Sequence, residues 1–528
     1  MTSSLIRGRP RRATSHISVR LVHTLLGLLA GVAWLVLPWM TINSGAPVPV
    51  TCANPGAASA AGAEQGGTSA ADLVLPLVAV GAAVVFAGYG YVRRTRRART
   101  RTTPGGTAVL AGPAVPPLSE ADERARASLV EADDCVRTSR EELGFAEARF
   151  EAAAVEPFAR AVRDAESELA AAFRMRQQYD DGVPEDEASR RHALAGIVGR
   201  CQEAGRRLDA EATGFDRLRA LEGDGLDGAL EPAEARFREL AGRTGAVDAI
   251  PAGLGERYGR SAAGTVTGYV EQAKDRLVFA TTRFNQARQR ADMGDGEGAA
   301  RHLRAAEGAT AQAAVFVTCV ERLAADLTAA AALVPAALTG AEAELAAAAR
   351  ATSARGLPVG ELHARAAHAD VVLAAVREEL TAGPYDPLDA LRRITRAIAP
   401  VAVGRAGVLS AAALLAARSA LAAADGFVTT HRGAVGSKAR TRLAEAERLL
   451  TMEPPDALAA DARARQAHDV AEQDVRVRGN PIADAAGHAT GAAGAVLGGI
   501  LRGTAPDGGS PVSYGGPHTR ARRAKQPG

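Results

Sequence analysis

Two long apolar runs lie near the beginning of the chain, and their length predicts transmembrane helices. Residues 21–40 read LVHTLLGLLAGVAWLVLPWM, and residues 73–92 read LVLPLVAVGAAVVFAGYGYV. A helix of this length spans about 30 Å, the thickness of the hydrocarbon core of a bilayer. Trp39 ends the first run and Tyr89 and Tyr91 end the second, which suits the interfacial preference of aromatic side chains.

The distribution of arginine predicts how these helices are oriented. Residues 41–72, between the runs, contain no Lys or Arg. Because cytoplasmic flanks are enriched in basic residues, we expect both termini in the cytoplasm and residues 41–72 outside, in a cell-membrane protein with two helices. The basic residues that flank the two runs are Arg7, Arg9, Arg11, Arg12 and Arg20 before the first, and Arg93, Arg94, Arg96, Arg97, Arg99 and Arg101 after the second.

The first run has an alternative interpretation as a cleaved signal peptide. Its basic flank fits, but the run is long for a signal peptide and no well-placed small-residue cleavage site follows it closely. The segment after residue 92 stays cytoplasmic under either interpretation.

After a Pro/Gly-rich stretch at 102–118, the apolar spacing becomes helical. Ser119, followed by Glu120 and Asp122, resembles a capping box that opens a helix. Steps of three, four and seven residues then predict a heptad-like seam up to a turn at 180–184. The seam consists of Leu129, Val136, Leu143, Phe150, Val162, Leu169 and Phe173.

Gly and Pro divide the remainder of the body into further helices. Interruptions are expected at 223–232 and 244–268, and Gly294-Asp295-Gly296 predicts an antiparallel helical hairpin. Pro400 should kink or split its helix, and Pro454-Pro455 should form a turn. The expected helices cover 185–221, 269–293, 298–332, 336–352, 359–382, 386–424 and 436–474.

Composition supports an all-α fold. Apolar residues make up 47% of the 528 residues but aromatic residues only 4%, and alanine, the strongest helix former, dominates. We therefore predict two N-terminal transmembrane helices, a long cytoplasmic body of antiparallel helical hairpins or coiled coils, and a disordered tail. The expected divisions are a basic N-terminus at 1–20, helices at 21–40 and 73–92 around a disordered external loop at 41–72, a basic flank and linker at 93–118, the body at 119–476 and a Gly/Ala/Pro-rich tail at 477–528.

Charge restricts the expected partners. The net charge of +3 is balanced locally except at the N-terminus, at residues 93–101 and at the C-terminal end, so a uniform basic field for nucleic acid is not expected. The cluster Arg93, Arg94, Arg96, Arg97, Arg99 and Arg101 could contact anionic lipid head groups, or it could simply mark the cytoplasmic flank of the helix. Self-association or protein partners are expected for the helical body.

No motif indicates chemistry. The chain has no GxxxxGK[ST], HExxH or GxSxG pattern, so we predict no catalytic, cofactor-binding or metal-binding residue. Of the cysteines, Cys135, Cys201 and Cys319 are expected to be small buried or idle thiols, and Cys52 is either a free external thiol or a bridge between two copies. Gln272–Arg288 is interpreted as a core helix or, alternatively, as a partner surface.

The body resembles the cytoplasmic region of TPM-domain membrane proteins from high-GC Gram-positive bacteria. The resemblance covers most of residues 73–523 in order. It is carried by RTSREELGFAEARF (137–150), RMRQQYDDGVPEDEASRR (174–191), EQAKDRLVFATTRFNQAR (271–288), HLRAAEGATAQAAVFV (302–317), YDPLDALRR (385–393), DGFVTTHRGAVGSKARTRLAEAERLL (425–450), GAVLGGIL (494–501) and the Gly/Arg-rich SYGGPHTRARR (513–523).

That family carries an extracytoplasmic α/β TPM module of well over a hundred residues, associated with phosphatase-like or assembly roles. Only the low-complexity residues 41–72 occupy its place here, so the resemblance implies no catalytic or metal residue. The sequence therefore favours a non-enzymatic membrane-anchored scaffold. The alternatives are a TPM-type phosphatase-like enzyme or its accessory, and a lipid-surface sensor that acts through the arginine cluster.

Overall fold

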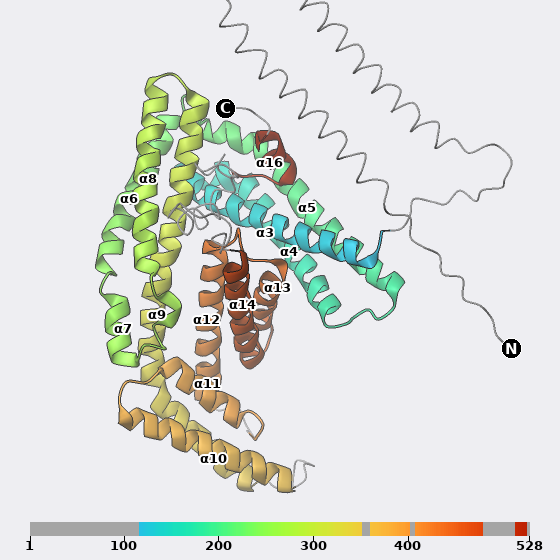
Figure 1. The fold of residues 1–528 in the computed structure, drawn as a ribbon, viewed down its shortest axis with the longest axis vertical. Helices are drawn as coiled ribbons and strands as arrows, with labels where there is room; N and C mark the ends of the chain where they lie inside the picture. The colour runs from blue at the N-terminus through green and yellow to red at the C-terminus, as the bar shows by residue number, and fades with distance from the viewer. Residues whose placement is uncertain (1–115, 351–358, 402–406, 479–512, 525–528) are drawn as a thin grey trace, which may run out of the picture. The chain divides into compact units, whose positions relative to one another are not determined.

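The computed structural model describes residues 116–350, 359–401, 407–478 and 513–524, all within one compact unit, Ala111–Gly528 (Figure 1). All regular structure in these ranges is helical. The two apolar runs at 21–40 and 73–92, the loop between them and the arginine cluster at 93–101 lie outside the described residues. The helices are α3 (Leu118–Glu147), α4 (Ala152–Asp180), α5 (Glu187–Arg219), α6 (Leu226–Ala246), α7 (Ile250–Tyr258), η2 (Gly264–Val266), α8 (Tyr269–Asp292), α9 (Gly296–Arg350), α10 (Val359–Ala382), α11 (Pro387–Ile398), α12 (Gly407–Thr430), α13 (Ser437–Thr451), α14 (Ala457–Arg478) and α16 (Pro517–Ala524).

The first three helices pack on one another around a shared core. Their apolar stripes meet at Leu129 of α3, Leu169 of α4 and Leu208 of α5, all of them buried. The seam predicted as one helix over 119–180 is in fact two helices, since the chain breaks between Glu147 and Ala152. A seven-residue apolar spacing is also kept when the chain folds back and both halves face the same core, so periodicity alone did not reveal the break.

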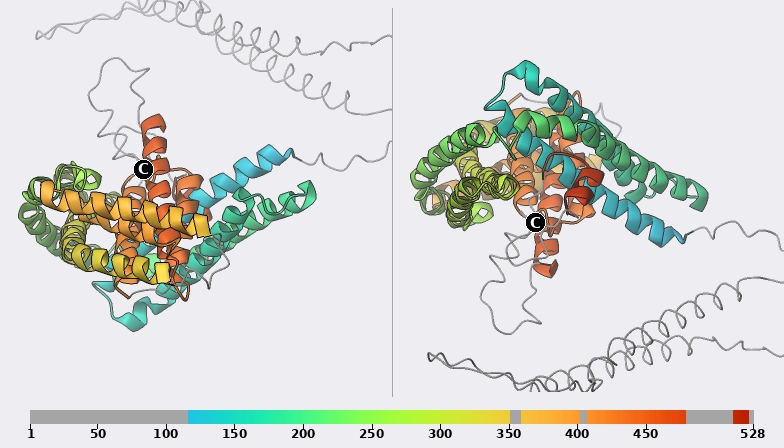
Figure 2. Two further views of the ribbon diagram at one scale, coloured as in Figure 1. Left: turned by 90° about the horizontal axis from the view of Figure 1, so that it is seen from below. Right: turned by 90° about the horizontal axis from the view of Figure 1, so that it is seen from above.

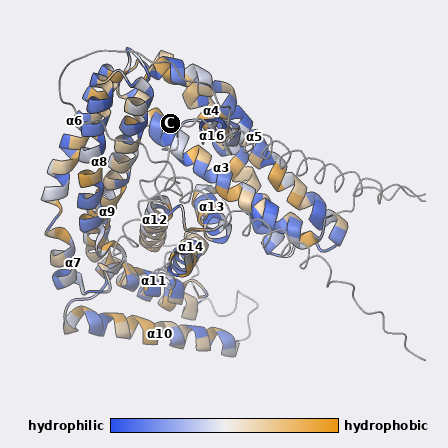
Figure 3. Cartoon of the chain, turned by 45° about the horizontal axis from the view of Figure 1, so that its top comes forward, coloured by the Kyte–Doolittle hydropathy of each residue, from blue (hydrophilic) through white to orange (hydrophobic). Residues whose placement is uncertain are grey.

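A second group, α6 to α9, forms a layer in which α8 lies along α9 (Figures 1 and 2). Apolar and polar residues alternate in stripes along these helices, as amphipathic packing requires (Figure 3). The predicted break between 332 and 336 is wrong, because α9 continues through Pro335 to Arg350. The proline removes one backbone donor, and burial of the neighbouring Val334 and Ala337 offsets that loss.

The Gly/Pro-rich stretches at 223–232 and 244–268 interrupt the chain less than predicted. Helix α6 begins at Leu226 and contains Pro232 near its start, and α7 and η2 occupy parts of the second stretch. Proline is tolerated in the first turns of a helix, where few backbone donors have an intrahelical partner. Tertiary packing of Leu230 and Leu254 supplies the remaining stabilisation.

The last group contains α11 to α14. Helix α11 ends at Ile398, immediately before Pro400, and α12 begins at Gly407, so the predicted split of 386–424 is confirmed. Helix α12 packs closely on α9 at Gly426, where a Cβ atom would lie 2.5 Å from Cys319 Sγ. Because Gly426 has no side chain, α12 can approach α9 closely at this point.

Helices α9 and α12 are also long and apolar enough to cross a membrane, judged by length and composition. Both pack against other described helices, and Phe316 and Val317 of α9 and Ala417 of α12 are completely buried. Buried core helices meet the same criteria of length and composition.

The prediction of a disordered tail is wrong for its final part. Residues 513–524 are ordered, and α16 packs on α5 and α3 (Figure 1). The Gly/Ala/Pro-rich composition of residues 477–528 suggested disorder, but Tyr514 is fully buried among the first three helices.

Candidate functional site

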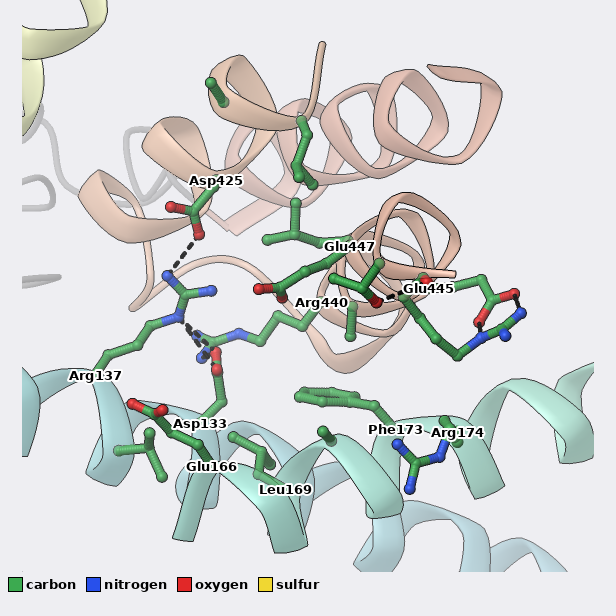
Figure 4. Close-up of a pocket in the computed structure, with 18 of the residues that line it drawn as sticks. Asp133, Arg137, Glu166, Leu169, Phe173, Arg174, Asp425, Arg440, Glu445 and Glu447 are labelled. Atoms are coloured by element: carbon green, nitrogen blue, oxygen red, sulfur yellow. Dashed lines mark hydrogen bonds and ion pairs between the residues drawn. The ribbon is translucent and has the colours of Figure 1, made fainter. Parts of the chain in front are cut away.

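Five helices enclose a charged cleft of about 760 Å³ (Figure 4). Each helix contributes residues spaced three or four positions apart, which places them on one helical face. We call this site the cleft. Its lining includes Asp133, Arg137 and Arg140 of α3, Glu166, Leu169, Phe173 and Arg174 of α4, Arg322 and Asp326 of α9, Arg418, Leu421 and Asp425 of α12, and Arg440, Leu443, Glu445, Glu447 and Arg448 of α13.

The floor of the cleft is a connected chain of ion pairs. Arg440 Nη1 lies 2.5 Å from Asp133 Oδ2, and Arg137 Nε lies 3.1 Å from Asp133 Oδ1. Arg137 Nη1 then reaches Asp425 Oδ1 at 2.8 Å (Figure 4). These contacts join α3 to α12 and α13, which are about three hundred residues later in the chain.

The protonation of Asp133 is set by competition within this chain of pairs. Burial by itself would raise the pKa of the Asp133 carboxyl, but the Arg137 and Arg440 guanidinium groups lower that pKa below 3.8. Asp133 is therefore ionised at neutral pH, and its negative charge is balanced by the two arginines beside it.

Three arginines of the cleft differ from those on the floor. Arg174, Arg322 and Arg418 are exposed. Among the described residues, none of them is within ion-pair or hydrogen-bond distance of a partner, although Arg322 interacts electrostatically with Asp326, one turn further along α9. An exposed guanidinium that lines a cleft and is not held in an ion pair is available to bind an external anionic group.

The lining of the cleft also contains apolar side chains. These are Phe173 and Leu169 of α4, labelled in Figure 4, and Leu421 of α12 and Leu443 of α13. Apolar side chains beside exposed arginines are typical of protein interfaces, where arginine and aromatic side chains are enriched.

The described lining offers little for covalent chemistry. It contains no cysteine or histidine, and Thr451 is its one residue with a hydroxyl group. Among the described residues, no cluster of His, Cys, Asp and Glu could hold a metal ion. Cys135 and Cys201 are buried elsewhere, and burial raises their pKa values to about 11 and about 12, which keeps both as thiols.

A second ionic cluster lies beside the cleft and links α3, α5 and α9. Arg219 Nη1 lies 3.1 Å from Glu142 Oε1, and Arg219 Nη2 lies 2.5 Å from Glu307 Oε1, with all three side chains buried. Burial opposes ionisation of Glu142, but Arg219 and Arg304, together with the backbone N–H of Tyr514, lower its pKa below 4.5.

The segment 272–288 belongs to α8, and one of its faces is buried. Arg276 is buried over the ring of Phe316 and donates from Nε to Gln312 Oε1 at 3.2 Å, and burial lowers its pKa to about 10. Phe284 is also buried, whereas Val278 is exposed. The core-helix interpretation therefore holds for one face of this segment.

Sequence reasoning missed the cleft for a definite reason. Arginine and carboxylate at spacings of three and four residues are typical of solvated helix surfaces. Asp133 and Arg137 have this spacing, and yet Asp133 is buried and Arg137 is half-buried in contacts with distant helices. The available signal was the pair Asp133-Asp134, two adjacent carboxylates on a helix that also carries Leu129 and Val136.

The lowered pKa values of Asp133 and Glu142 predict acid sensitivity. A carboxyl with a lowered folded-state pKa stabilises the protein fully above its unfolded-state pKa, here near 3.8 to 4.5, and this stabilisation is lost as the pH falls below that range. We expect the urea midpoint to drop steeply between pH 5 and pH 3. Asp133→Asn and Glu142→Gln should each lower the midpoint at pH 7 and flatten its pH dependence; an unchanged slope in both variants would contradict the assignment.

Comparison with known proteins gives one relationship. No protein-family model matches the chain, and no solved structure matches it. A UPF0603 protein from each of two strains of Mycobacterium tuberculosis is 32% identical to it over 448 residues. The match covers 78% of this chain and 66% of each relative, so the chain spans just under two thirds of the length of the curated relatives it matches. The chain is thus similar over most of its length to UPF0603 proteins of a high-GC actinobacterium, and membership of the TPM-domain family stays a prediction.

Proposed function

We propose that this chain is a non-enzymatic, membrane-anchored scaffold whose helical body binds a protein partner in the cleft. The apolar runs at 21–40 and 73–92, with their basic flanks, support the anchoring part of the proposal. The contrast within the cleft carries the binding part. The floor carboxylates Asp133 and Asp425 are held in ion pairs with arginines. Among the described residues, Arg174 and Arg418 have no such partner, and Arg322 has only the electrostatic influence of Asp326.

This contrast also suggests the chemistry of the partner. An acidic surface would pair with the three arginines, and apolar side chains on the same surface would pack on Phe173 and Leu421. A bound protein of this kind would be held at the cytoplasmic face of the membrane.

Site-specific photo-crosslinking tests the proposal. A photoreactive residue would replace Arg322 or Arg418 in the full chain, expressed in its own cells, and Arg288 on α8 is the matched exposed control. We expect the same protein adduct from both cleft positions, none from Arg288, and loss of the adduct when Arg174 is changed to Glu. Equal adducts from all three positions would contradict cleft binding.

The non-enzymatic part requires a separate assay. The purified full chain should hydrolyse a phosphomonoester such as p-nitrophenyl phosphate no faster than the buffer does. Turnover above background that disappears in an Asp326→Asn variant would instead support the enzyme alternative and locate it in the cleft.

A further inference from the structure

The C-terminal residues Ser513–Arg523, here called the tail segment, lie in a groove formed by α3, α4 and α5. Figure 1 shows α16 beside α5, and α16 also contacts α3. Residues 479–512 connect the tail segment to α14. Ser513, Tyr514 and Thr519 are all almost completely buried. Tyr514 and Thr519 donate to residues of α3 and α5 that lie more than three hundred positions earlier in the sequence.

Tyr514 is the anchor of the segment. Its ring stacks on Phe215 with the ring centroids 4.3 Å apart, and it meets Phe158 edge-on at 6.2 Å. Its hydroxyl group donates a hydrogen bond to the Phe158 carbonyl oxygen at 3.1 Å. The slot places an acceptor, the Phe158 carbonyl oxygen, at the hydroxyl end of the ring, so it favours tyrosine over phenylalanine, whose ring would forgo this hydrogen bond.

The groove also recognises the backbone of the segment. The N–H of Tyr514 donates to Glu142 Oε2 at 2.6 Å, and the N–H of Gly515 donates to Ser139 Oγ at 3.1 Å. Asp209 Oδ1 accepts from the N–H groups of Gly516 and Thr519, each at 2.9 Å. Arg219 and Arg304 pair with Glu142 Oε1, whereas Glu142 Oε2 and Ser139 Oγ accept from the tail segment. Buried acceptor atoms are costly to leave without donors, so the groove favours an occupant with free backbone N–H groups.

Steric fit demands glycine at two positions of the occupant. Gly515 has φ of 131°, a conformation that residues with a Cβ rarely adopt, and a Cβ on Gly516 would collide with the backbone carbonyl of Gly205. The groove shows the same close approach, since a Cβ on Gly205 would lie 2.6 Å from Pro517 Cδ. The sequence selected is therefore Tyr-Gly-Gly-Pro.

A basic residue completes the recognition. Arg523 Nη2 lies 2.5 Å from Asp216 Oδ2, and its Nη1 donates to the Tyr514 carbonyl oxygen at 3.3 Å. Arg520 donates to the Asp134 carbonyl oxygen at 2.9 Å. The tail segment thus has an aromatic anchor, backbone hydrogen bonds, a steric requirement for glycine and a charged contact. Peptides bound in the recognition sites of other proteins have the same kinds of contact.

We propose that this groove is a peptide-binding site, that the chain's own tail segment is its resident ligand, and that a peptide of the same Tyr-Gly-Gly-Pro-basic sequence can replace the segment. The proposal is independent of partner binding in the cleft.

The test uses the full chain and a fluorescent peptide with the sequence of residues 511–524. Tyr514→Ala should release the tail segment, and the peptide should then bind the variant at least about tenfold more tightly than it binds the wild-type chain. A peptide carrying Gly516→Val should not bind. Asp209→Ala, added to Tyr514→Ala, should weaken peptide binding by about tenfold or more while the helical circular dichroism stays unchanged.

Limited trypsin digestion reports tail release directly. Cleavage after Arg520, Arg522 or Arg523 should be faster in Tyr514→Ala and in a second release variant, Gly516→Val, than in the wild-type chain. If the tail is released in either variant and the peptide still shows no saturable binding, the proposal is overturned. Equal peptide affinity for the wild-type chain and both variants would also overturn the proposal. So would a wild-type dimer, detected by sedimentation, that dissociates in Tyr514→Ala, because the tail segment would then bind a second copy of the chain.

Discussion

Replacing Arg440 by Met is expected to lower the free energy of unfolding by about 3–5 kcal/mol. Arg440 is almost completely buried and donates to Asp133 and Asp134, and also to the carbonyl oxygens of Val435 and Arg432. Methionine fills a similar volume but leaves two buried carboxylates without their principal cation. Urea denaturation of the full chain, followed by circular dichroism, measures the change.

Arg442→Met is the matched control for this prediction. Arg442 lies on the same helix, is half-buried and makes no ion pair with another described residue. Its replacement should change the unfolding free energy by no more than about 0.5 kcal/mol. Adding Asp133→Asn to Arg440→Met should recover part of the loss. Similar losses of unfolding free energy in Arg440→Met and Arg442→Met would show that the ion pairs of Arg440 are not the main reason for its effect on stability.

Replacing Phe316 by Ala is expected to cost about 3–5 kcal/mol of unfolding free energy. Phe316 lies on α9, is fully buried, and meets the Tyr269 ring edge-on with centroids 5.0 Å apart. The buried Arg276 guanidinium also lies over its ring at 5.7 Å. Alanine would leave a cavity and remove the aromatic support of a buried cation, so both effects act in the same direction.

Phe279→Ala provides the comparison for that cavity. Phe279 is on the neighbouring helix α8, is half-buried and has the Arg283 guanidinium over its ring. Because less apolar surface is buried there, the loss should be less than half of that at Phe316 when both are measured by urea midpoint. Equal losses of unfolding free energy in Phe316→Ala and Phe279→Ala would show that Phe316 is not the more tightly packed of the two.

Much of the helical architecture could be predicted from apolar spacing and from Gly and Pro. Pro400 separates α11 from α12 as expected. The errors at Pro335 and at the junction of α3 and α4 share a cause: proline and periodicity set local preferences of a few kcal/mol, and burial of neighbouring residues outweighs or hides them.

The charged sites were harder to predict for a different reason. Asp133 and Arg137 have the spacing of a surface pair, and the tail segment has the composition of a disordered terminus. Nothing local distinguishes a carboxylate in water from one buried against Arg440, since the difference lies in the groups that distant helices bring near it.

The sequence by itself determined the helical class, the two apolar runs and most positions at which helices end, because these depend on backbone propensity and on the spacing of neighbouring residues. Only the tertiary structure decided which arginines of the cleft are held in ion pairs on its floor and which are exposed. It also decided that Tyr514 has a slot between Phe158 and Phe215. The physical reason is that burial and pairing are properties of contacts between residues about three hundred positions apart, such as Asp133 and Arg440, which no local pattern encodes.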